Sequence, residues 1–207
     1  MNPARLARFH DCPRYFICPL CHAELNLAGT SLRCPNRHTF DIAKQGYVNL
    51  EPAAKQSQFY SKESFANRGR ILNAGYYSHI ASAVLAAVRT HCPANPRPAV
   101  LDAGCGEGFY ARAVQQANPQ ADVLAFDISK DSVQQAARED TSLAVRWFVG
   151  NLADLPLRDA AVDCILDVFS PVHYGEFGRV LRPGGIVVKV VPGARHDEQL
   201  RELASAH

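Results

Sequence analysis

The chain has 207 residues, of which 47% are hydrophobic and 20% are charged, and its formal net charge is +2. This length allows one α/β domain with a small additional module, and the composition is that of an ordinary globular protein. The longest apolar runs, 80–88 and 185–192, are shorter than the roughly 20 residues of a membrane span, and residues 1–16 lack the apolar stretch of a secretory signal.

Charge and cysteine content differ along the chain. Residues 1–70 carry ten Lys and Arg against five Asp and Glu, whereas residues 71–207 carry twelve against fifteen. An anionic partner is expected to bind at the basic front, although a modest bias of this kind is more often only a solvated surface. Seven cysteines, grouped as one CxxC pair and otherwise scattered, are typical of a reducing compartment. We therefore expect a cytoplasmic protein with no membrane partner.

Residues 1–50 are predicted to form a zinc-binding module. Its four candidate ligands follow the spacing CxxC, twelve residues, CxxxH, and are Cys18, Cys21, Cys34 and His38. Between the two pairs we expect a zinc-ribbon hairpin with strands at 23–27 and 31–34. Four protein ligands fill a tetrahedral shell, so the predicted zinc is structural rather than catalytic. His22 and Cys12 are possible substitute ligands, and buried free thiols or a disulfide are the alternative to a metal.

Residues 51–97 are predicted to be a linker and helical segment. The stretch 40–50 before it mixes apolar and polar residues and is expected to be linker-like. Apolar residues then recur at helical spacing in two pieces, 62–73 and 76–90, with Ser61 as the N-cap of the first. Prolines after the second piece end the helical pattern.

Strands and helices alternate in residues 98–207. The expected strands are 99–103, 122–128, 143–149, 161–169 and 185–191. The expected helices are 108–118, 130–139 and 173–181. This alternation predicts an α/β fold with a doubly wound, Rossmann-like parallel sheet and helices on both faces.

The first of these strands runs into a glycine-rich loop, DAGCGEG, at 102–108. Its alternating glycines let the backbone approach a ligand at the carboxyl end of the sheet. A dinucleotide fingerprint would need glycine at position 109, where the chain has Phe109. An acid leading into GxGxG instead resembles motif I of class I S-adenosylmethionine methyltransferases, where the loop lies beside the methionine part of the cofactor. Asp102 and Gly104 are therefore candidate cofactor-binding residues.

Two further segments are candidates for binding the same cofactor. Asp127 ends the second strand and fits the acid that accepts hydrogen bonds from the ribose hydroxyls, a feature that dinucleotide enzymes share. The stretch 150–156 follows the third strand, where methyltransferases pack the adenine, so Asn151 and Leu152 are candidates; a plain surface loop is the alternative. Together with the glycine loop, these segments predict a methyltransferase, and another kind of nucleotide-binding enzyme is the alternative.

Five segments taken in order resemble the RlmA-type family of bacterial enzymes, which methylate N1 of a guanine in a hairpin of 23S ribosomal RNA. They are CPLC…LRCPNRHTFDIAKQGYVNL, ILNAGYY, LDAGCGEGFY, RVLRPGG and PGARH, and the similarity runs from about Phe16 to Leu200. The resemblance implies the same four zinc ligands, and it places further residues against the cofactor: Tyr77, Glu107, Gly108 and His196. A core aromatic is the alternative for Tyr77, and a solvated residue is the alternative for His196.

The resemblance implies a substrate and a place for it. N-methyltransferases usually hold the target ring at the end of the fourth strand, here DVFSPV. The candidate catalytic and substrate-pocket residues are therefore Asp167, Phe169, Ser170 and Pro171. Asp167 is the nearest candidate proton acceptor; a core role for Phe169 and a capping role for Asp167 are the alternatives. The basic residues expected to contact RNA phosphates from the zinc module are Arg14, Arg33, Arg37 and Lys44.

The chain departs from the family pattern in two places. Many members carry an acidic residue where this chain has Tyr60 or Ser61. Members also continue beyond the position of His207 with the last two strands of the sheet, so we expect the C-terminal strands to be missing here. The fifth strand would then be an exposed edge that a second copy could cover, as in a homodimer. A weak or inactive relative that retains zinc and RNA binding is the alternative function.

Overall fold

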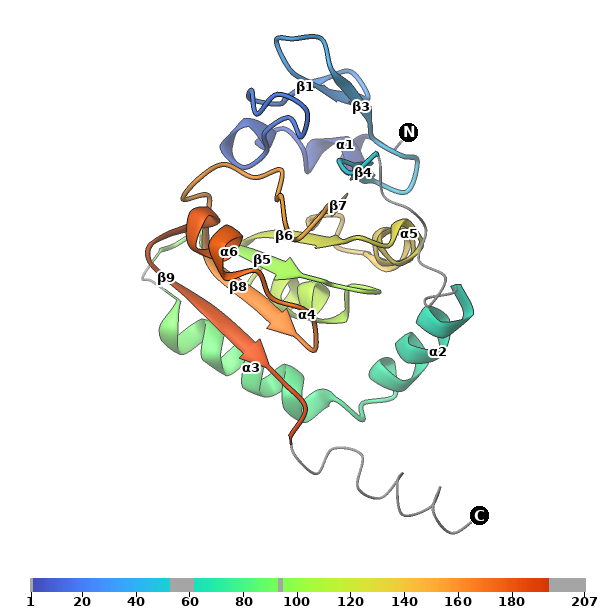
Figure 1. The fold of residues 1–207 in the computed structure, drawn as a ribbon. Helices are drawn as coiled ribbons and strands as arrows, with labels where there is room; N and C mark the ends of the chain where they lie inside the picture. Colours follow the sequence, from blue (N-terminus) through green and yellow to red (C-terminus); the bar gives the residue numbers. More distant parts are fainter. Residues whose placement is uncertain (1, 53–61, 93–94, 194–207) are drawn as a thin grey trace.

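The computed structural model describes residues 2–52, 62–92 and 95–193, and a six-stranded sheet lies at its centre (Figure 1). The strand order is β4-β7-β6-β5-β8-β9, and every neighbouring pair is parallel. Its strands are β4 Tyr47–Asn49, β5 Ala99–Ala103, β6 Asp122–Asp127, β7 Arg146–Val149, β8 Val162–Val168 and β9 Leu181–Val190. The predicted alternation of strands and helices in a parallel sheet is confirmed.

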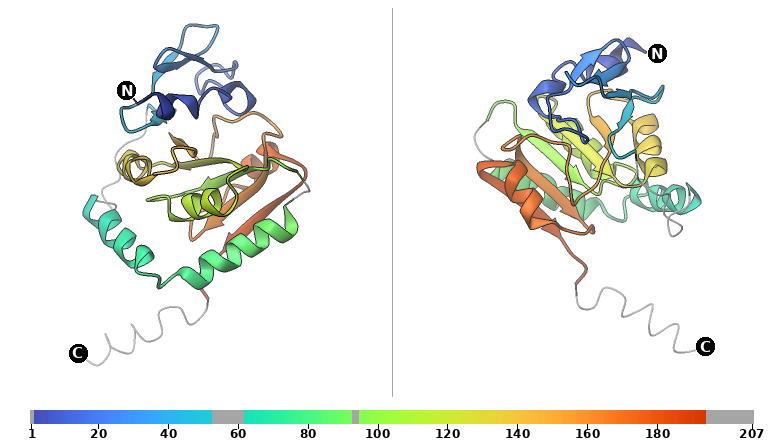
Figure 2. Two further views of the ribbon diagram at one scale, coloured as in Figure 1. Left: turned by 180° about the vertical axis from the view of Figure 1, so that it is seen from behind. Right: turned by 45° about the horizontal axis from the view of Figure 1, so that its top comes forward.

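Helices cover one face of this sheet. They are α3 Ser78–His91, α4 Phe109–Ala117 and α5 Lys130–Glu139, and their buried apolar side chains share one core cluster with that face. α2 Lys62–Asn73 packs against α4 and α5 (Figure 2). Gly75, at a φ of +88°, lies between α2 and α3 and explains the predicted break, because a left-handed residue ends a helix. In the described residues no single helix has the length and apolar character to cross a membrane, although α2 and α3, bent by 78°, meet that test of length and composition as a pair.

The opposite face is covered by α6 Tyr174–Val180 and by the N-terminal residues. Phe16 is fully buried there, and its ring meets Phe148 of β7 edge-on with 5.2 Å between centroids. Phe148 in turn stacks on Phe126 of β6 at 5.3 Å. The expectation of helices on both faces therefore holds only in part, because in the described residues the N-terminal module supplies most of the second layer.

The N-terminal module contains short elements only. They are α1 Pro3–Ala7, the 3₁₀ turn η1 Cys12–Arg14, and an antiparallel sheet of β1 Asn26–Ala28, β2 Ser31–Arg33 and β3 Thr39–Asp41. The predicted hairpin is present, but its first strand begins at 26 rather than 23. The reason is that the preceding residues close a turn, in which the Cys18 N–H donates to the Ala23 carbonyl at 2.7 Å.

β4 shows that the linker-like expectation for 40–50 is wrong at its end. Tyr47 pairs with Trp147 across the edge of the main sheet, and the Leu50 N–H donates to the Val149 carbonyl at 3.0 Å. The apolar residues of this stretch are buried in the sheet, Val48 completely. A strand of three residues is too short to show a readable alternation, so its place in the sheet was missed.

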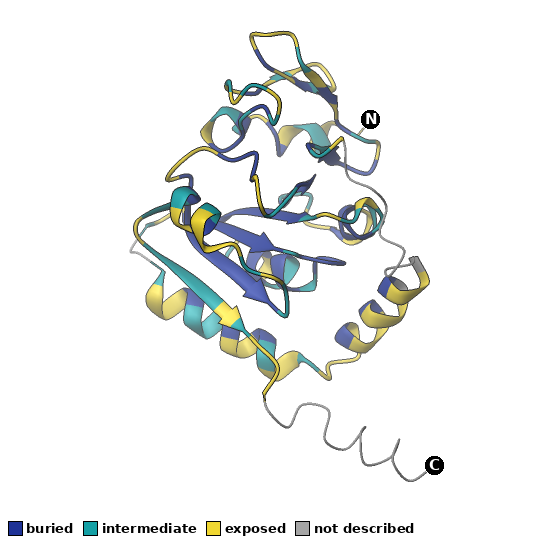
Figure 3. Cartoon of the chain, in the orientation of Figure 1, coloured by how far each residue is buried: buried dark blue, intermediate teal, exposed yellow. Residues whose placement is uncertain are grey.

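β9 forms the other edge of the sheet and is only half-buried along most of its length (Figure 3). It begins at Leu181, earlier than the predicted 185, and the expected tight turn at Gly184 is instead an irregularity within the strand, at a φ of +80°. Tyr60, Ser61 and His196 lie outside the described residues, so the predictions for them stand as made.

The covering role of Phe16 leads to a prediction about the whole chain. Phe16→Ala should lower the free energy of unfolding by about 3–5 kcal/mol, because it leaves a cavity against the sheet. Leu20→Ala, at a side chain that is 58% exposed, should change it by less than about 0.5 kcal/mol. Urea unfolding of the zinc-loaded chain, followed by the fluorescence of its single tryptophan, Trp147, measures both. An unchanged Trp147 transition in Phe16→Ala would mean that the module is a separate folding unit.

Candidate cofactor and metal sites

The four predicted metal ligands lie together at the base of the hairpin. The ligand atoms of Cys18, Cys21, Cys34 and His38 all lie within 4.8 Å of one another. The sulfur–sulfur distance between Cys21 and Cys34 is 3.7 Å, and His38 Nδ1 lies 3.4 Å from Cys18 Sγ and 3.5 Å from Cys34 Sγ. A zinc tetrahedron with bonds of about 2.3 Å to sulfur and about 2.0–2.1 Å to nitrogen has edges of about 3.6–3.8 Å. The donor set therefore fits a closed, structural zinc.

The two substitute ligands are not part of this cluster. The Cys12 thiol is buried elsewhere and donates to the Leu25 carbonyl at 3.3 Å. His22 is exposed, at a φ of +56°, and is absent from the group of ligand atoms that surround the candidate metal position. The spacing argument thus selects the four ligands that the fold brings together.

The glycine loop between β5 and α4 has a backbone conformation that requires glycine. Gly104, Gly106 and Gly108 have φ values of +73°, +53° and +78°. These values lie in the left-handed region, which residues other than glycine rarely adopt. A Cβ at Gly104 would lie 2.6 Å from Ser170 Cβ, and a Cβ at Gly108 would overlap the Trp147 ring. Both close approach and positive φ therefore demand glycine at these two positions.

Asp102 supports this loop from below. Its side chain is almost fully buried and accepts a hydrogen bond from the Ala111 N–H at 3.0 Å, which ties the strand end to the first turns of α4. Burial raises the pKa of Asp102 to about 7. The geometry thus points to Asp102 as a support of the predicted cofactor loop.

Asp127 lies at the carboxyl end of β6, beside the glycine loop. One oxygen accepts from the Gly106 N–H at 3.0 Å and the other from the Ser129 N–H at 2.8 Å. Burial raises the pKa of Asp127, and these two N–H groups oppose the rise. The two hydrogen bonds therefore fix the orientation of the Asp127 carboxylate at the carboxyl end of the sheet.

A cleft of about 240 Å³ opens at the carboxyl ends of the central strands. The predicted residues that line it are Gly104, Asp127, Leu152, Phe169, Ser170 and Pro171. Asn151 is not among the lining residues; its side-chain oxygen accepts from the Ala153 N–H at 3.0 Å and shapes the loop. The fold thus brings six of the thirteen predicted cofactor and substrate residues together around this cleft.

Asp167 lies behind the cleft rather than in it. Its side chain is fully buried, with one oxygen 2.5 Å from Lys189 Nζ and the other accepting from Ser170 Oγ at 2.6 Å. Both oxygens are thus engaged, and the geometry does not favour the expectation that Asp167 accepts the substrate proton. Asp167 instead holds the turn that carries Ser170.

Tyr77 lines a second chamber next to the cleft. This chamber is also lined by Tyr110 and Ile71, and it shares Arg68 and Phe169 with the first. The rings of Tyr77 and Phe169 meet edge-on at 6.2 Å. The cofactor role of Tyr77, which the family resemblance implies and spacing alone did not indicate, stays a prediction.

Sequence reasoning missed the contribution of α2. Phe65 and Arg68 line the cleft, and Arg68 forms an ion pair with the buried Glu107, with 3.5 Å between Nε and Oε1. The apolar spacing of 62–73 predicts the helix but does not show which part of the molecule it meets. Burial raises the pKa of Glu107, and the charge of Arg68 opposes the rise.

Comparison with protein families identifies two parts of the chain. Residues 16–58 match the family described as "RlmA, N-terminal", a zinc ribbon, and residues 100–185 match a methyltransferase domain. A 23S rRNA (guanine(748)-N(1))-methyltransferase of Streptomyces fradiae is 36% identical over 93% of this chain and 68% of its own length. A putative 23S rRNA (guanine-N(1)-)-methyltransferase of Bacillus subtilis is 34% identical over 91% of this chain and 68% of its own length. The chain thus spans about two thirds of these relatives.

Solved structures share the fold. A putative S-adenosylmethionine-dependent methyltransferase from Methanococcus maripaludis superposes with a TM-score of 0.54 at 21% identity, over 73% of this chain and 72% of that one. The sheet is therefore that of a class I S-adenosylmethionine methyltransferase, joined here to an N-terminal zinc ribbon. The residues fit both S-adenosylmethionine and zinc. The glycine loop lies beside a cleft that the cofactor could occupy, and the distances within the Cys3His set are those of a zinc site.

The demand for glycine at position 108 is testable by cofactor binding. Gly108→Ala should weaken S-adenosylmethionine binding at least about 10-fold, because the new methyl group overlaps Trp147 and displaces the loop. The matched control is Gly184→Ala, which has the same backbone strain at a φ of +80° but nothing within 4 Å of the new atom. Calorimetric titration should show wild-type affinity for this control. Equal affinity in both variants would mean that the loop does not bind the cofactor.

Proposed function

Because the chain belongs to the family of 23S rRNA (guanine-N1)-methyltransferases, we propose that it transfers the methyl group of S-adenosylmethionine to N1 of a guanine in 23S ribosomal RNA. The observation that carries the proposal is the joining, in one chain, of an RlmA-type zinc ribbon and a class I methyltransferase cleft. This combination matches its relatives along nearly the whole chain. Ribosomal RNA as substrate agrees with the expected cytoplasmic location.

The reaction places two demands on the protein. When bound, S-adenosylmethionine supplies an electrophilic methyl group on its sulfonium; guanine N1 gains this methyl and loses its proton, leaving S-adenosylhomocysteine. Guanine N1 must be held in line with the methyl–sulfur bond, at about 3–3.5 Å from the methyl carbon. N1 is hidden inside a base pair, so the guanine must come from a loop or be flipped out, at a cost of a few kcal/mol.

Phe169 is the residue that we propose to hold the flipped base. Its backbone has a φ of +56°, a strained conformation for a bulky side chain, and its ring lies between the cleft and the second chamber. Such strain concentrates at functional sites, and flipped bases are commonly held by stacking on aromatic rings. Ser170 and Pro171 line the same cleft, and the Ser170 hydroxyl donates a hydrogen bond to Asp167 behind it.

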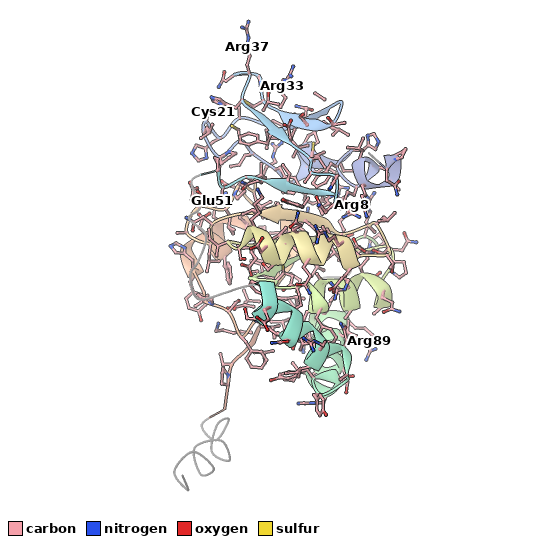
Figure 4. The ribbon with its side chains drawn as sticks, turned by 90° about the vertical axis from the view of Figure 1, so that its right-hand side faces the viewer. Arg8, Cys21, Arg33, Arg37, Glu51 and Arg89 are labelled. Carbon is pink, nitrogen blue, oxygen red and sulfur yellow. The ribbon has the colours of Figure 1, made fainter. Side chains whose placement is uncertain are left out.

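The zinc module is proposed to grip the RNA. Arg33 and Arg37 are exposed at the outer end of the molecule, pointing away from the sheet (Figure 4), and Lys44 is also exposed. Arg14 is less available, because it lies 3.6 Å from Asp122 and its guanidinium lies over the Tyr15 ring. Contacts of this kind position an RNA without reading its sequence. A homodimer stays a prediction.

Methyl transfer can be measured directly. The zinc-loaded chain, incubated with unmodified 23S ribosomal RNA and labelled S-adenosylmethionine, should label the RNA at one guanine. Reverse transcription should stop there, because a methyl group on N1 blocks base pairing. Cofactor binding and RNA binding without any transfer would contradict the proposal and support the alternative, a weak or inactive relative.

The exposed arginines give a second test. Replacing Arg33 and Arg37 together by Gln should weaken RNA binding about 10-fold at 0.1 M salt and reduce its salt dependence, because two phosphate contacts are lost. S-adenosylmethionine affinity should stay unchanged, since the side chains lie far out on the hairpin. The matched control is Arg89→Gln, at an exposed arginine on α3. Equal loss of both affinities would show that the module only supports folding.

A further inference from the structure

Ser170 connects the cleft with the buried pair of Asp167 and Lys189. It lines the cleft, and its Oγ lies 2.6 Å from Asp167 Oδ1. Lys189 Nζ, on the neighbouring strand β9, lies 2.5 Å from Asp167 Oδ2. Asp167 is fully buried and does not line the cleft, so it cannot take a proton from a bound molecule directly. The Ser170 hydroxyl provides the path by which a proton can reach it.

The contacts of Ser170 lack one proton. Besides Asp167 Oδ1, its Oγ lies 2.7 Å from the carbonyl oxygen of Ala103, the last residue of β5. Both partners are acceptors, whereas a serine hydroxyl has one proton to donate, so the two contacts share it. With one more proton, Asp167 could donate to Ser170 Oγ while Ser170 donates to Ala103, and each contact would then be a complete hydrogen bond. The arrangement is thus suited to take up one proton.

Ser170 also lies against the glycine loop. A Cβ at Gly104 would be 2.6 Å from Ser170 Cβ and 3.0 Å from Ser170 Oγ. On its other side, Ser170 follows Phe169, the residue that we propose to hold the flipped base. The hydroxyl therefore lies between the predicted cofactor loop and the proposed base-binding ring. Methyl transfer to N1 has to take place between these two.

The other polar side chains of the cleft are less suited to accept a proton. In the part of the chain that the structure describes, they are Arg68, Asp127 and Ser129. Arg68 is a cation with no acceptor. Both oxygens of Asp127 accept from backbone N–H groups, and Ser129 Oγ accepts from the Ser132 N–H at 3.4 Å as the N-cap of α5. Ser170, by contrast, has a carboxylate directly behind its hydroxyl.

We infer that Ser170 accepts the proton of guanine N1 and passes its own proton to Asp167, an inference that rests on the proposed function. Guanine N1 bonds to the methyl carbon, and the electron pair of the methyl–sulfur bond stays with the sulfur. The N1–H bond breaks with its electron pair left on N1, the proton bonds to Ser170 Oγ, and the former Ser170 proton bonds to Asp167 Oδ1. Asp167 later releases this proton to water. Ser170 is thus the catalytic residue, whereas Asp167 and Lys189 act through it.

Two single variants and their combination test this relay. Ser170→Ala removes the hydroxyl, and Asp167→Asn keeps the shape of the side chain but cannot take up the proton. With the zinc-loaded full chain in excess over unmodified 23S ribosomal RNA, each should lower the single-turnover rate of methyl transfer about 100-fold. The double variant should be no slower than the slower single variant, because the two groups act as one unit. S-adenosylmethionine affinity, measured by calorimetry, should stay within about 2-fold of wild type in all three, because the proton moves only during the reaction.

The pH dependence distinguishes a relay from a structural role. Alkaline solution removes the N1 proton of guanine without help from the protein, so the relay matters less there. The rate loss in Ser170→Ala should therefore shrink from about 100-fold at about pH 7 to less than about 10-fold at about pH 9. The charged groups that face the relay are Lys189 from β9 and, across the cleft, Arg68 and Asp127, and they are the same in wild type and variant. A loss of equal size at both pH values would overturn the inference.

The matched control is Asp163→Asn, at the opposite end of β8. Asp163 is also buried and pairs with a cation of β9, with 2.7 Å between its Oδ2 and Arg182 Nη1. This variant should keep the transfer rate within about 2-fold of wild type. An equal loss in Asp163→Asn and Asp167→Asn, or a double variant in which the two single losses multiply, would overturn the relay.

The outcomes also separate this inference from the proposed function. Wild-type transfer rates in Ser170→Ala would overturn the relay alone. No transfer by the unaltered chain would overturn the proposed function, and the relay with it.

Discussion

A parallel sheet must be buried on both faces, and the N-terminal module, whose Phe16 packs on Phe148, supplies most of the cover of the second face beside α6. The zinc supplies the order that lets a segment of short elements act as a layer, because so few residues bury too little apolar surface to fold unaided. The metal thus stabilises more than the hairpin. It orders the module, and the module in turn covers one face of the main sheet. The glycine loop and the cleft are built on that sheet.

A chain of buried polar contacts connects this layer to the cofactor loop. Arg8 of the N-terminal module lies 3.3 Å from Asp140, which also accepts a hydrogen bond from the Trp147 indole at 3.0 Å. The far edge of the Trp147 ring lies against Gly108. Buried ion pairs of this kind do little for net stability, and Arg8 Nη2, the nitrogen that faces Asp140, has no hydrogen-bond partner among the described residues. These contacts nevertheless connect the glycine loop with a residue near the start of the chain.

The features that the sequence predicts well are those that depend on residues close together in the chain. The Cys3His spacing and the glycines at the end of β5 are local requirements, and both appear in the fold where expected. Features that depend on distant partners are not visible in the sequence. The role of Asp167 as proton acceptor stays a prediction, and nothing in its own segment shows that Lys189 lies opposite it in β9. Arg68 lies on a correctly predicted helix, but only the fold shows that this helix reaches the cleft; Tyr77 came from family resemblance alone.

The place of β4 at the sheet edge has a consequence for synthesis. Tyr47 pairs with Trp147, about a hundred residues later in the chain. At roughly 5–20 residues per second, translation leaves that partner strand missing for about 5–20 s after β4 is made. The metal-bound hairpin can fold during this interval. β4 and the apolar residues of the module that pack on the main sheet, such as Phe16, then still lack that sheet. During synthesis these apolar residues are therefore exposed near the ribosome exit, where chaperones can bind them. Because β4 belongs to the main sheet, the zinc ribbon could not be moved to another enzyme by recombination without losing this pairing.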